Sequence, residues 1–161
     1  MNYCGSSDED LEIKSLLTRV FVDGGFTDRS DAETMFVSAA LQDRGEIILA
    51  RSVESKLLGM IIFVRPTSSA RQVADMNEAE IQLLAVYPEA RNQGIASQLI
   101  LVCEQRAISS GYSKMVLSTQ QMMKEAHHIY EKLGYHRNPS RNWSGKGTNK
   151  IYFVYEKVLQ Y

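Results

Sequence analysis

The clearest structural signal in the chain lies at one junction, Val86-Tyr87-Pro88-Glu89-Ala90-Arg91-Asn92-Gln93-Gly94-Ile95-Ala96. An aliphatic strand ends at Pro88, and an amphipathic helix is predicted from Gly94 to about Ser110. The small residues Gly94 and Ala96 allow another group to approach the backbone closely where this helix begins. Unpaired N–H groups and the positive end of the helix dipole meet there, so the junction suits a phosphate.

Composition places the chain among ordinary globular proteins. Its 161 residues have a formal net charge of −1, with 44% hydrophobic and 23% charged residues, so we expect a single domain over residues 1–161. A nearly neutral chain lacks the broad positive field that favours nucleic acid or an anionic membrane, so we expect neither as a partner. The N-terminus lacks the apolar stretch of a signal peptide, so we expect a cytoplasmic protein with Cys4 and Cys103 reduced.

Apolar periodicity predicts a mixed α/β fold around the junction. The expected elements, in chain order, are helices at 8–24 and 30–42, strands at 46–51, 57–64 and 81–87, the junction helix, a strand at 115–117, a helix at 122–133 and a strand at 150–159. Polar loops are expected at 67–77 and 138–149. The alternation of strand, helix and strand after the junction implies parallel strands joined by a right-handed crossover.

The junction alone leaves two interpretations open. Gly94 could simply permit the turn while Ala96 packs the helix on the sheet. The segment also lacks the Lys-Ser/Thr ending of a nucleotide-binding P-loop and the first glycine of the dinucleotide fingerprint. The remaining phosphate hypothesis is a pyrophosphate held mainly by main-chain groups.

Two segments resemble a known family. The strand Ala79-Glu80-Ile81-Gln82-Leu83-Leu84-Ala85-Val86 and the following Arg91-Asn92-Gln93-Gly94-Ile95-Ala96 resemble the core motif of the GNAT N-acetyltransferase superfamily, Q/R-x-x-G-x-G/A. Ala126, followed by Tyr130-Glu131-Lys132-Leu133-Gly134-Tyr135, resembles its second signature, A-x-x-x-Y-E-x-x-G-F/Y. The order of elements is similar as well. The chain therefore resembles a small single-domain member of bacterial type over essentially its whole length.

The resemblance implies both a fold and an activity. The fold is a central twisted mixed sheet of six to seven strands flanked by about four helices, with its first strand in residues 1–4. The activity is transfer of an acetyl group from acetyl-CoA, as co-substrate, to a primary amine by direct attack in a ternary complex. Homodimers are common in the superfamily. The cofactor-binding residues implied by the match are Leu84, Ala85, Val86, Arg91, Asn92, Gln93, Gly94, Ile95, Ala96 and Ser97.

Glu80 and Tyr130 are the candidate catalytic residues. An alkyl amine with a pKa near ~10 must lose a proton before it attacks, and Glu80 matches the position of the catalytic glutamate in some members. A water chain serves as the base in others, and a glutamate at a strand start is often only solvated. Tyr130 matches the tyrosine that protonates the leaving thiolate, although its spacing also fits a buried helix stripe. A main-chain N–H near Leu84 is the expected oxyanion donor.

Several other residues have competing interpretations. Met123 stands where many members have an asparagine that contacts the cofactor, so that polar contact is not expected. His127, His128 and His136 lack the spacing of metal ligands, and we expect no metal. Cys103 falls on an apolar helix face, which favours a structural thiol.

The acceptor is the least determined part of the prediction. In the superfamily its pocket is built from segments that correspond to 21–31, 67–77 and 138–149. Trp143 lies in the last of these, where lining the pocket and covering the core are equally good interpretations. A small-molecule amine or amino acid is the first expectation, and a protein N-terminus or lysine is the second. A non-catalytic acyl-CoA-binding or regulatory module is the rival class.

Overall fold

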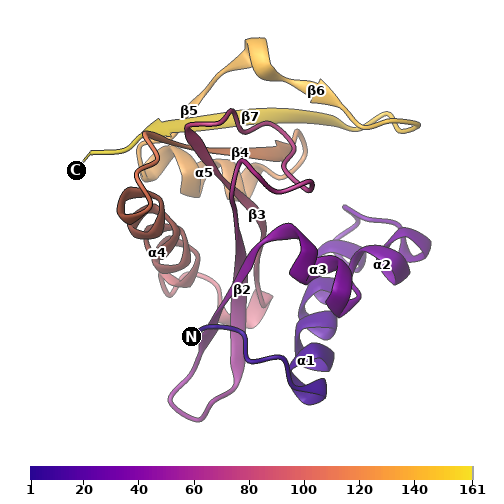
Figure 1. The fold of residues 1–161 in the computed structure, drawn as a ribbon. Helices are drawn as coiled ribbons and strands as arrows, with labels where there is room; N and C mark the ends of the chain where they lie inside the picture. The colour runs from indigo at the N-terminus through magenta and orange to yellow at the C-terminus, as the bar shows by residue number, and fades with distance from the viewer. Residues whose placement is uncertain (161) are drawn as a thin grey trace.

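A twisted sheet of seven strands runs through the computed structural model, which describes residues 1–160 (Figure 1). The strand order is β1-β2-β3-β4-β7-β5, and β6 pairs with β7. The strands are β1 Glu46–Arg51, β2 Leu57–Val64, β3 Glu78–Val86, β4 Lys114–Gln120, β5 His136–Arg137, β6 Trp143–Ser144 and β7 Ile151–Val158. The mixed α/β class and the predicted strand number are confirmed.

Helices cover both faces of this sheet (Figure 1). The helices are α1 Ser7–Leu17, α2 Arg29–Met35, α3 Ser38–Arg44, α4 Ile95–Ser109 and α5 Lys124–Lys132, with a π-helical turn at Thr18–Val22 and 3₁₀ turns at Pro88–Ala90 and Pro139–Arg141. None of the helices in residues 1–160 combines the length and the apolar character needed to cross a membrane.

Strand β3 pairs parallel with β4, and all other pairs are antiparallel. The connection between the parallel strands is α4, as the strand–helix–strand alternation predicts. Strand β2 is buried on both faces along most of its length, which explains its nearly continuous aliphatic sequence.

Alternation along the strands divides the core into two clusters. Ile47, Leu49, Met60 and Ile62 face α1, α2 and α3. On the other face, Ile48, Ile61, Phe63, Ile81 and Leu117 pack with α4 and α5. The first face also carries buried polar groups at the start of β3, namely Glu78, Glu80 and Gln82.

The prediction of one helix over 30–42 is wrong, because the chain breaks between α2 and α3. Val37 has an extended backbone (φ −76°, ψ 148°), which ends the first helix and begins the second. The break lets Phe36 turn into the core, where it is 1% exposed and lies 6.1 Å from the Phe21 ring. Burial of this aromatic ring outweighs the continuity of a short helix.

The strand expected in residues 1–4 is reduced to a single bridge between Asn2 and Ile48. Tyr3 N donates to Ile47 O at 3.2 Å, so the chain does lie along the edge of β1. Gly5 then adopts a positive φ of 82° and turns the chain, and the Ser6 side chain caps α1. The helix therefore begins before a strand can develop.

Two leucines of α1 test the assignment of its buried face. Leu16 is 0% exposed and Leu11 is 64% exposed, although they lie in the same helix. We expect Leu16→Ala to lower the free energy of unfolding by about 2–5 kcal/mol, because it leaves a cavity. Leu11→Ala should change it by less than ~0.5 kcal/mol. Urea denaturation measures both, and equal losses would contradict the assigned face.

Candidate active site

Strands β3 and β4 separate before either of them ends. They pair from Glu78 with Lys114 to Ile81 with Leu117, yet β3 continues to Val86 and β4 to Gln120. The two strands diverge beyond the paired part (Figure 1). Main-chain groups of β3 that face this opening have no partner on β4. An opening of this kind can accept an extended, amide-containing chain by strand-like pairing.

A bulge in β3 accompanies the separation. Met60 pairs with Ala85 and Ile62 with Gln82, so Leu83 and Leu84 together face the single residue Ile61 of β2. Leu83 has a φ of 50°, which is rare for a leucine. A bulge bends its strand and redirects the main-chain groups that follow it. The end of β3 is therefore turned away from β4, and its last residues, Leu84, Ala85 and Val86, face the opening.

The turn after β3 presents its backbone to solvent. Asn92 and Gly94 both adopt left-handed conformations, with φ of 63° and 79°. Residues 91–94 are exposed, and a Cβ placed on Gly94 would meet nothing within 4 Å. Gly94 caps α4 without a side-chain hydrogen bond, so the first N–H groups of the helix keep their donor capacity. Such N–H groups at a helix N-terminus suit an anion.

The predicted cofactor residues therefore lie along one continuous edge. Leu84, Ala85 and Val86 line the end of β3, and the segment from Arg91 to Ser97 follows at the start of α4. Arg91 also forms an exposed ion pair of 3.5 Å with Glu125 of α5, on the other side of the opening.

Gly59 belongs to the same region, although sequence reasoning missed it. A Cβ on Gly59 would lie 2.8 Å from Ala85 O and 3.1 Å from Val86 Cγ2. Only glycine therefore allows β2 to approach the end of β3 this closely. The available signal was a lone glycine inside an aliphatic strand.

Tyr130 lies on α5 with its ring against the sheet. It is 6% exposed and packs 5.7 Å from the Tyr155 ring and 6.1 Å from the Tyr135 ring. Its hydroxyl makes no hydrogen bond to any other described residue. Burial raises the pKa of Tyr130, so the hydroxyl keeps its proton at neutral pH. The geometry leaves a protonated donor without a hydrogen-bond partner among residues 1–160.

The carboxylate of Glu80 is enclosed and is used by the protein itself. Glu80 is 0% exposed and accepts main-chain N–H groups of Gln72, Val73 and Ala74 at 3.0–3.1 Å. Gln82 Nε2 donates to it as well, at 2.8 Å. A carboxylate has about four lone-pair positions, so these contacts occupy them all. The general-base role of Glu80 stays a prediction, and the observed contacts favour a different role.

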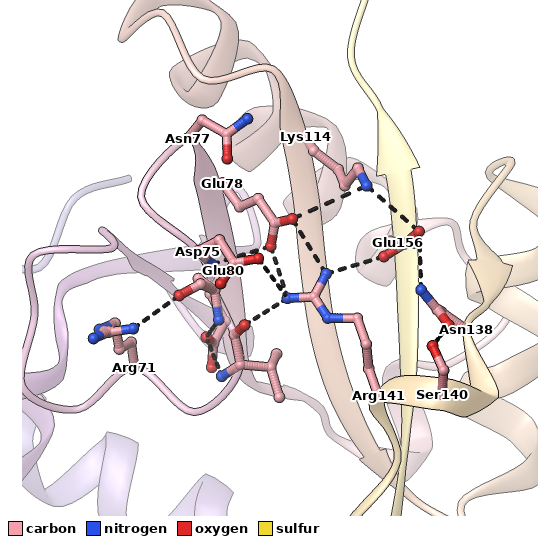
Figure 2. A network of polar contacts seen from close by, with 12 residues as sticks. Arg71, Asp75, Asn77, Glu78, Glu80, Lys114, Asn138, Ser140, Arg141 and Glu156 are labelled. Carbon is pink, nitrogen blue, oxygen red and sulfur yellow. Dashed lines mark hydrogen bonds and ion pairs between the residues drawn. The ribbon is translucent and has the colours of Figure 1, made fainter.

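Arg141 connects the loop at 67–77 with the last part of the chain (Figure 2). Its guanidinium donates to Val73 O at 2.6 Å, to Glu78 at 2.9 and 3.2 Å, and to Glu156 at 3.0 Å. Hydrogen bonding to Glu78 raises the pKa of Arg141, so the guanidinium stays protonated at neutral pH. Lys114 lies 3.5 Å from Glu156 and adds a second cation to this network.

An unsatisfied polar group lies at the end of β4. Gln120 is 7% exposed, and its Nε2 donates to Phe26 O at 3.0 Å. Lys150 Nζ donates to the same carbonyl at 2.6 Å. The Gln120 Oε1 atom is buried without a hydrogen-bond partner in the described part of the chain. A buried acceptor without a partner is unfavourable, so a water molecule or a ligand donor would be stabilised at this oxygen.

Trp143 stacks beside this glutamine. Its ring lies 4.2 Å from that of Tyr152 at an interplanar angle of 8°, and its Nε1 donates to Ser118 Oγ at 2.9 Å. Tyr152 pairs with Gln120 across the β4–β7 ladder, so the aromatic pair and the amide share one face. By alternation this is also the face of Glu80 and Gln82.

His127 and Cys103, two other residues considered in the sequence analysis, are packed against neighbouring groups of the protein. His127 packs between Phe153 and Tyr155, and its Nε2 lies 3.1 Å from Gln120 O. Cys103 is buried, and burial raises the pKa of its thiol to about 12. Among residues 1–160, no group of three or more His, Cys, Asp or Glu side chains is placed to hold a metal ion.

Comparison with known proteins gives a consistent result. Human N-acetyltransferase 8 is 32% identical over 113 residues, which are 68% of this chain and 45% of that protein. The chain thus spans less than half of that relative. The fold is similar to a Streptococcus agalactiae acetyltransferase (TM-score 0.77, 17% identity, 99% of this chain and 96% of that one) and a Staphylococcus aureus GNAT-family acetyltransferase (TM-score 0.74, 18% identity, 99% and 98%).

A family model adds the assignment. The model described as "Acetyltransferase (GNAT) family" matches residues 11–135, which include both strands of the opening, all of α4 and Tyr130 of α5. This match covers well over half of the sequence and includes each segment that resembled the superfamily. The chain belongs to the GNAT acetyltransferase family.

Proposed function

We propose that this protein is an N-acetyltransferase that moves an acetyl group from acetyl-CoA to a primary amine within a ternary complex. The observation that carries the proposal is the opening between β3 and β4, which lies next to the exposed N-terminus of α4. Coenzyme A combines an amide-containing arm with a pyrophosphate, and the two parts of the site suit these two chemistries. Family membership supports the same conclusion.

The residues present fit this co-substrate. The end of β3 at Leu84, Ala85 and Val86 would pair with the pantetheine amides, because its main chain lacks a strand partner there. The N–H groups of the segment from Gln93 to Ser97 would hold the pyrophosphate, since nothing fills the space beside Gly94. Bound acetyl-CoA supplies an activated thioester. A main-chain N–H near the bulge at Leu84 would stabilise the negative charge that develops on its carbonyl oxygen.

Tyr130 is the best-placed general acid in this scheme. Its hydroxyl is protonated, lies on the helix that borders the opening, and is not engaged by another residue of 1–160. The departing thiolate needs a proton, and a tyrosine in this state can give one.

The acceptor amine would approach from the face that carries Gln120. The orphaned Oε1 of this side chain can accept an N–H from an amine, and the Trp143–Tyr152 pair offers a flat apolar wall beside it. A small-molecule amine or amino acid fits these few groups. A protein N-terminus or lysine is the alternative acceptor, and a non-catalytic acyl-CoA-binding module is the alternative function.

The proposed activity is tested with purified protein, acetyl-CoA and a panel of small amines, amino acids and peptides. We expect release of free coenzyme A thiol only when an amine is present. Binding of coenzyme A without turnover on any acceptor would favour the binding module. No binding at all, measured by calorimetry, would overturn the proposal.

A charge added to the first turn of α4 tests the pyrophosphate site. We expect Ser97→Glu to weaken coenzyme A binding about 10-fold to 100-fold, because like charges repel. The same change should leave the thermal midpoint unchanged or raise it, since acidic residues stabilise helix N-termini. Gln105→Glu, an exposed change in the same helix, is the control and should change the affinity less than about twofold. Wild-type affinity in Ser97→Glu would exclude this site.

Removal of one hydroxyl tests the general acid. We expect Tyr130→Phe to lower kcat about 100-fold or more while the Kd of acetyl-CoA stays within about twofold. Tyr155→Phe is the matched control, because its hydroxyl already donates to Glu131 Oε1 at 3.0 Å. Since burial raises the pKa of Tyr130, the wild-type kcat should show no alkaline fall from this group below pH ~10. Equal kcat values for the two variants would argue against Tyr130.

A further inference from the structure

We propose that Glu80, Glu78 and Arg141 form a clamp that holds residues 67–77, here called the acceptor loop, as a fixed wall of the amine site. The three are then positioning residues, and the clamp gives Glu80 a role other than that of general base. This inference rests on the proposed function for its consequence in catalysis. The clamp itself is a structural feature and can be tested without turnover.

The Glu80 carboxylate binds main-chain N–H groups of the acceptor loop. Three consecutive amides, those of Gln72, Val73 and Ala74, converge on its two oxygens. Hydrogen bonds from N–H groups to a charged acceptor are among the strongest in proteins. The loop has no helix or strand of its own, so these bonds replace the regular structure that would otherwise satisfy its backbone.

Glu78 and Arg141 hold the same loop from its other side. Arg141 donates to Val73 O, so both main-chain groups of Val73 bind charged side chains. Glu78 accepts Asp75 N at 3.2 Å and also binds both terminal nitrogens of Arg141 (Figure 2). Glu78 is 5% exposed, so its charge requires this partner. The loop is therefore fixed to β3 and to the 3₁₀ turn at Pro139–Arg141 at once.

The clamped loop lies next to the bulge. Gln82, one residue before Leu83, donates to Ala70 O of the loop at 2.8 Å and to Glu80. Gln82 Oε1 in turn accepts a hydrogen bond from Arg44 of α3 at 2.9 Å. Release of the loop would thus change the sheet face that Gln82 shares with Gln120, from which the amine is proposed to approach. The start of α4, at the other end of β3, would be unaffected.

The two hypotheses for Glu80, a clamp and a general base, predict different effects of Glu80→Gln on the kinetics. A general base must have a lone pair within reach of the amine, and loss of its charge removes the acidic limb of the pH profile. A clamp works through the loop, so its loss changes amine binding while the pH profile keeps its shape. In Glu80→Gln the amide NH₂ would face loop N–H donors, so the substitution also weakens the clamp.

The test compares Glu80→Gln and Arg141→Met with wild type. For the clamp, we expect hydrogen exchange at residues 72–74 to become about 10-fold to 100-fold faster in both variants. The KM for the amine should rise about 10-fold in both, with KM for acetyl-CoA within about twofold and an unchanged apparent pKa in the pH profile. Arg141→Lys should restore part of the loss, because it keeps the charge but not the two-pronged contact.

Arg51→Met is the matched control. Arg51 is also a largely buried arginine with two carboxylate partners, Glu9 and Glu12, but it lies on β1 away from the loop. It should lose stability without faster exchange at 72–74 or a change in the amine KM.

Two outcomes would overturn the clamp. One is wild-type exchange at 72–74 in both variants. The other is a lost acidic limb in Glu80→Gln together with an unchanged amine KM in Arg141→Met, which would make Glu80 the base. If the wild-type protein acetylates no amine, the proposed function fails, and the exchange measurement still decides whether the clamp exists.

Discussion

The separation of β3 from β4 is the constraint on which the other features of the site depend. Pairing stops at Ile81 and Leu117 because the bulge at Leu83 and Leu84 turns β3 away while β4 continues straight. Every N–H and C=O left facing the opening must be satisfied by water or by a ligand. Since only residues 87–94 separate β3 from α4, the bend that opens the strands also places the N-terminus of α4 near the end of the opening. One local distortion therefore leaves both an unpaired strand edge and the unpaired N–H groups of a helix N-terminus at the same place.

The first half of β3 carries buried charged side chains and not unpaired main-chain groups. Glu78 and Glu80 are buried carboxylates on a sheet face that otherwise packs against helices, and isolated charges there would be strongly unfavourable. Loop N–H groups and Arg141 compensate both charges. The same contacts give a loop without regular structure a defined position. The cost of burying the carboxylates is thus offset by the hydrogen bonds that order the loop.

Much of this architecture could be predicted from the sequence, and the part that could not has a physical reason. Strands at 46–51 and 57–64 match β1 and β2, because aliphatic runs and local periodicity determine them. The break at Phe36 could not be predicted, since it depends on a tertiary contact with Phe21. Arg141 and Gln120 were missed because their roles depend on partners distant in sequence. Glu80 was singled out by its position in the motif, but its hydrogen bonds could not be predicted, because the three loop amides lie six to eight residues away in a segment without periodicity.

The two halves of β3 consequently differ in what the sequence can reveal about them. A site made of main-chain groups, such as the one proposed beside Gly94, tolerates many side chains, so a short motif is enough to predict it. A site made of side chains is specific to each protein, and family membership says little about it. Next to the acceptor loop, Arg141 and Lys114 pair with Glu78 and Glu156, so these two carboxylates are already engaged by cations of the protein. Under the proposed function, recognition of the amine would depend on single contacts such as the Gln120 oxygen and on the shape of the wall around it.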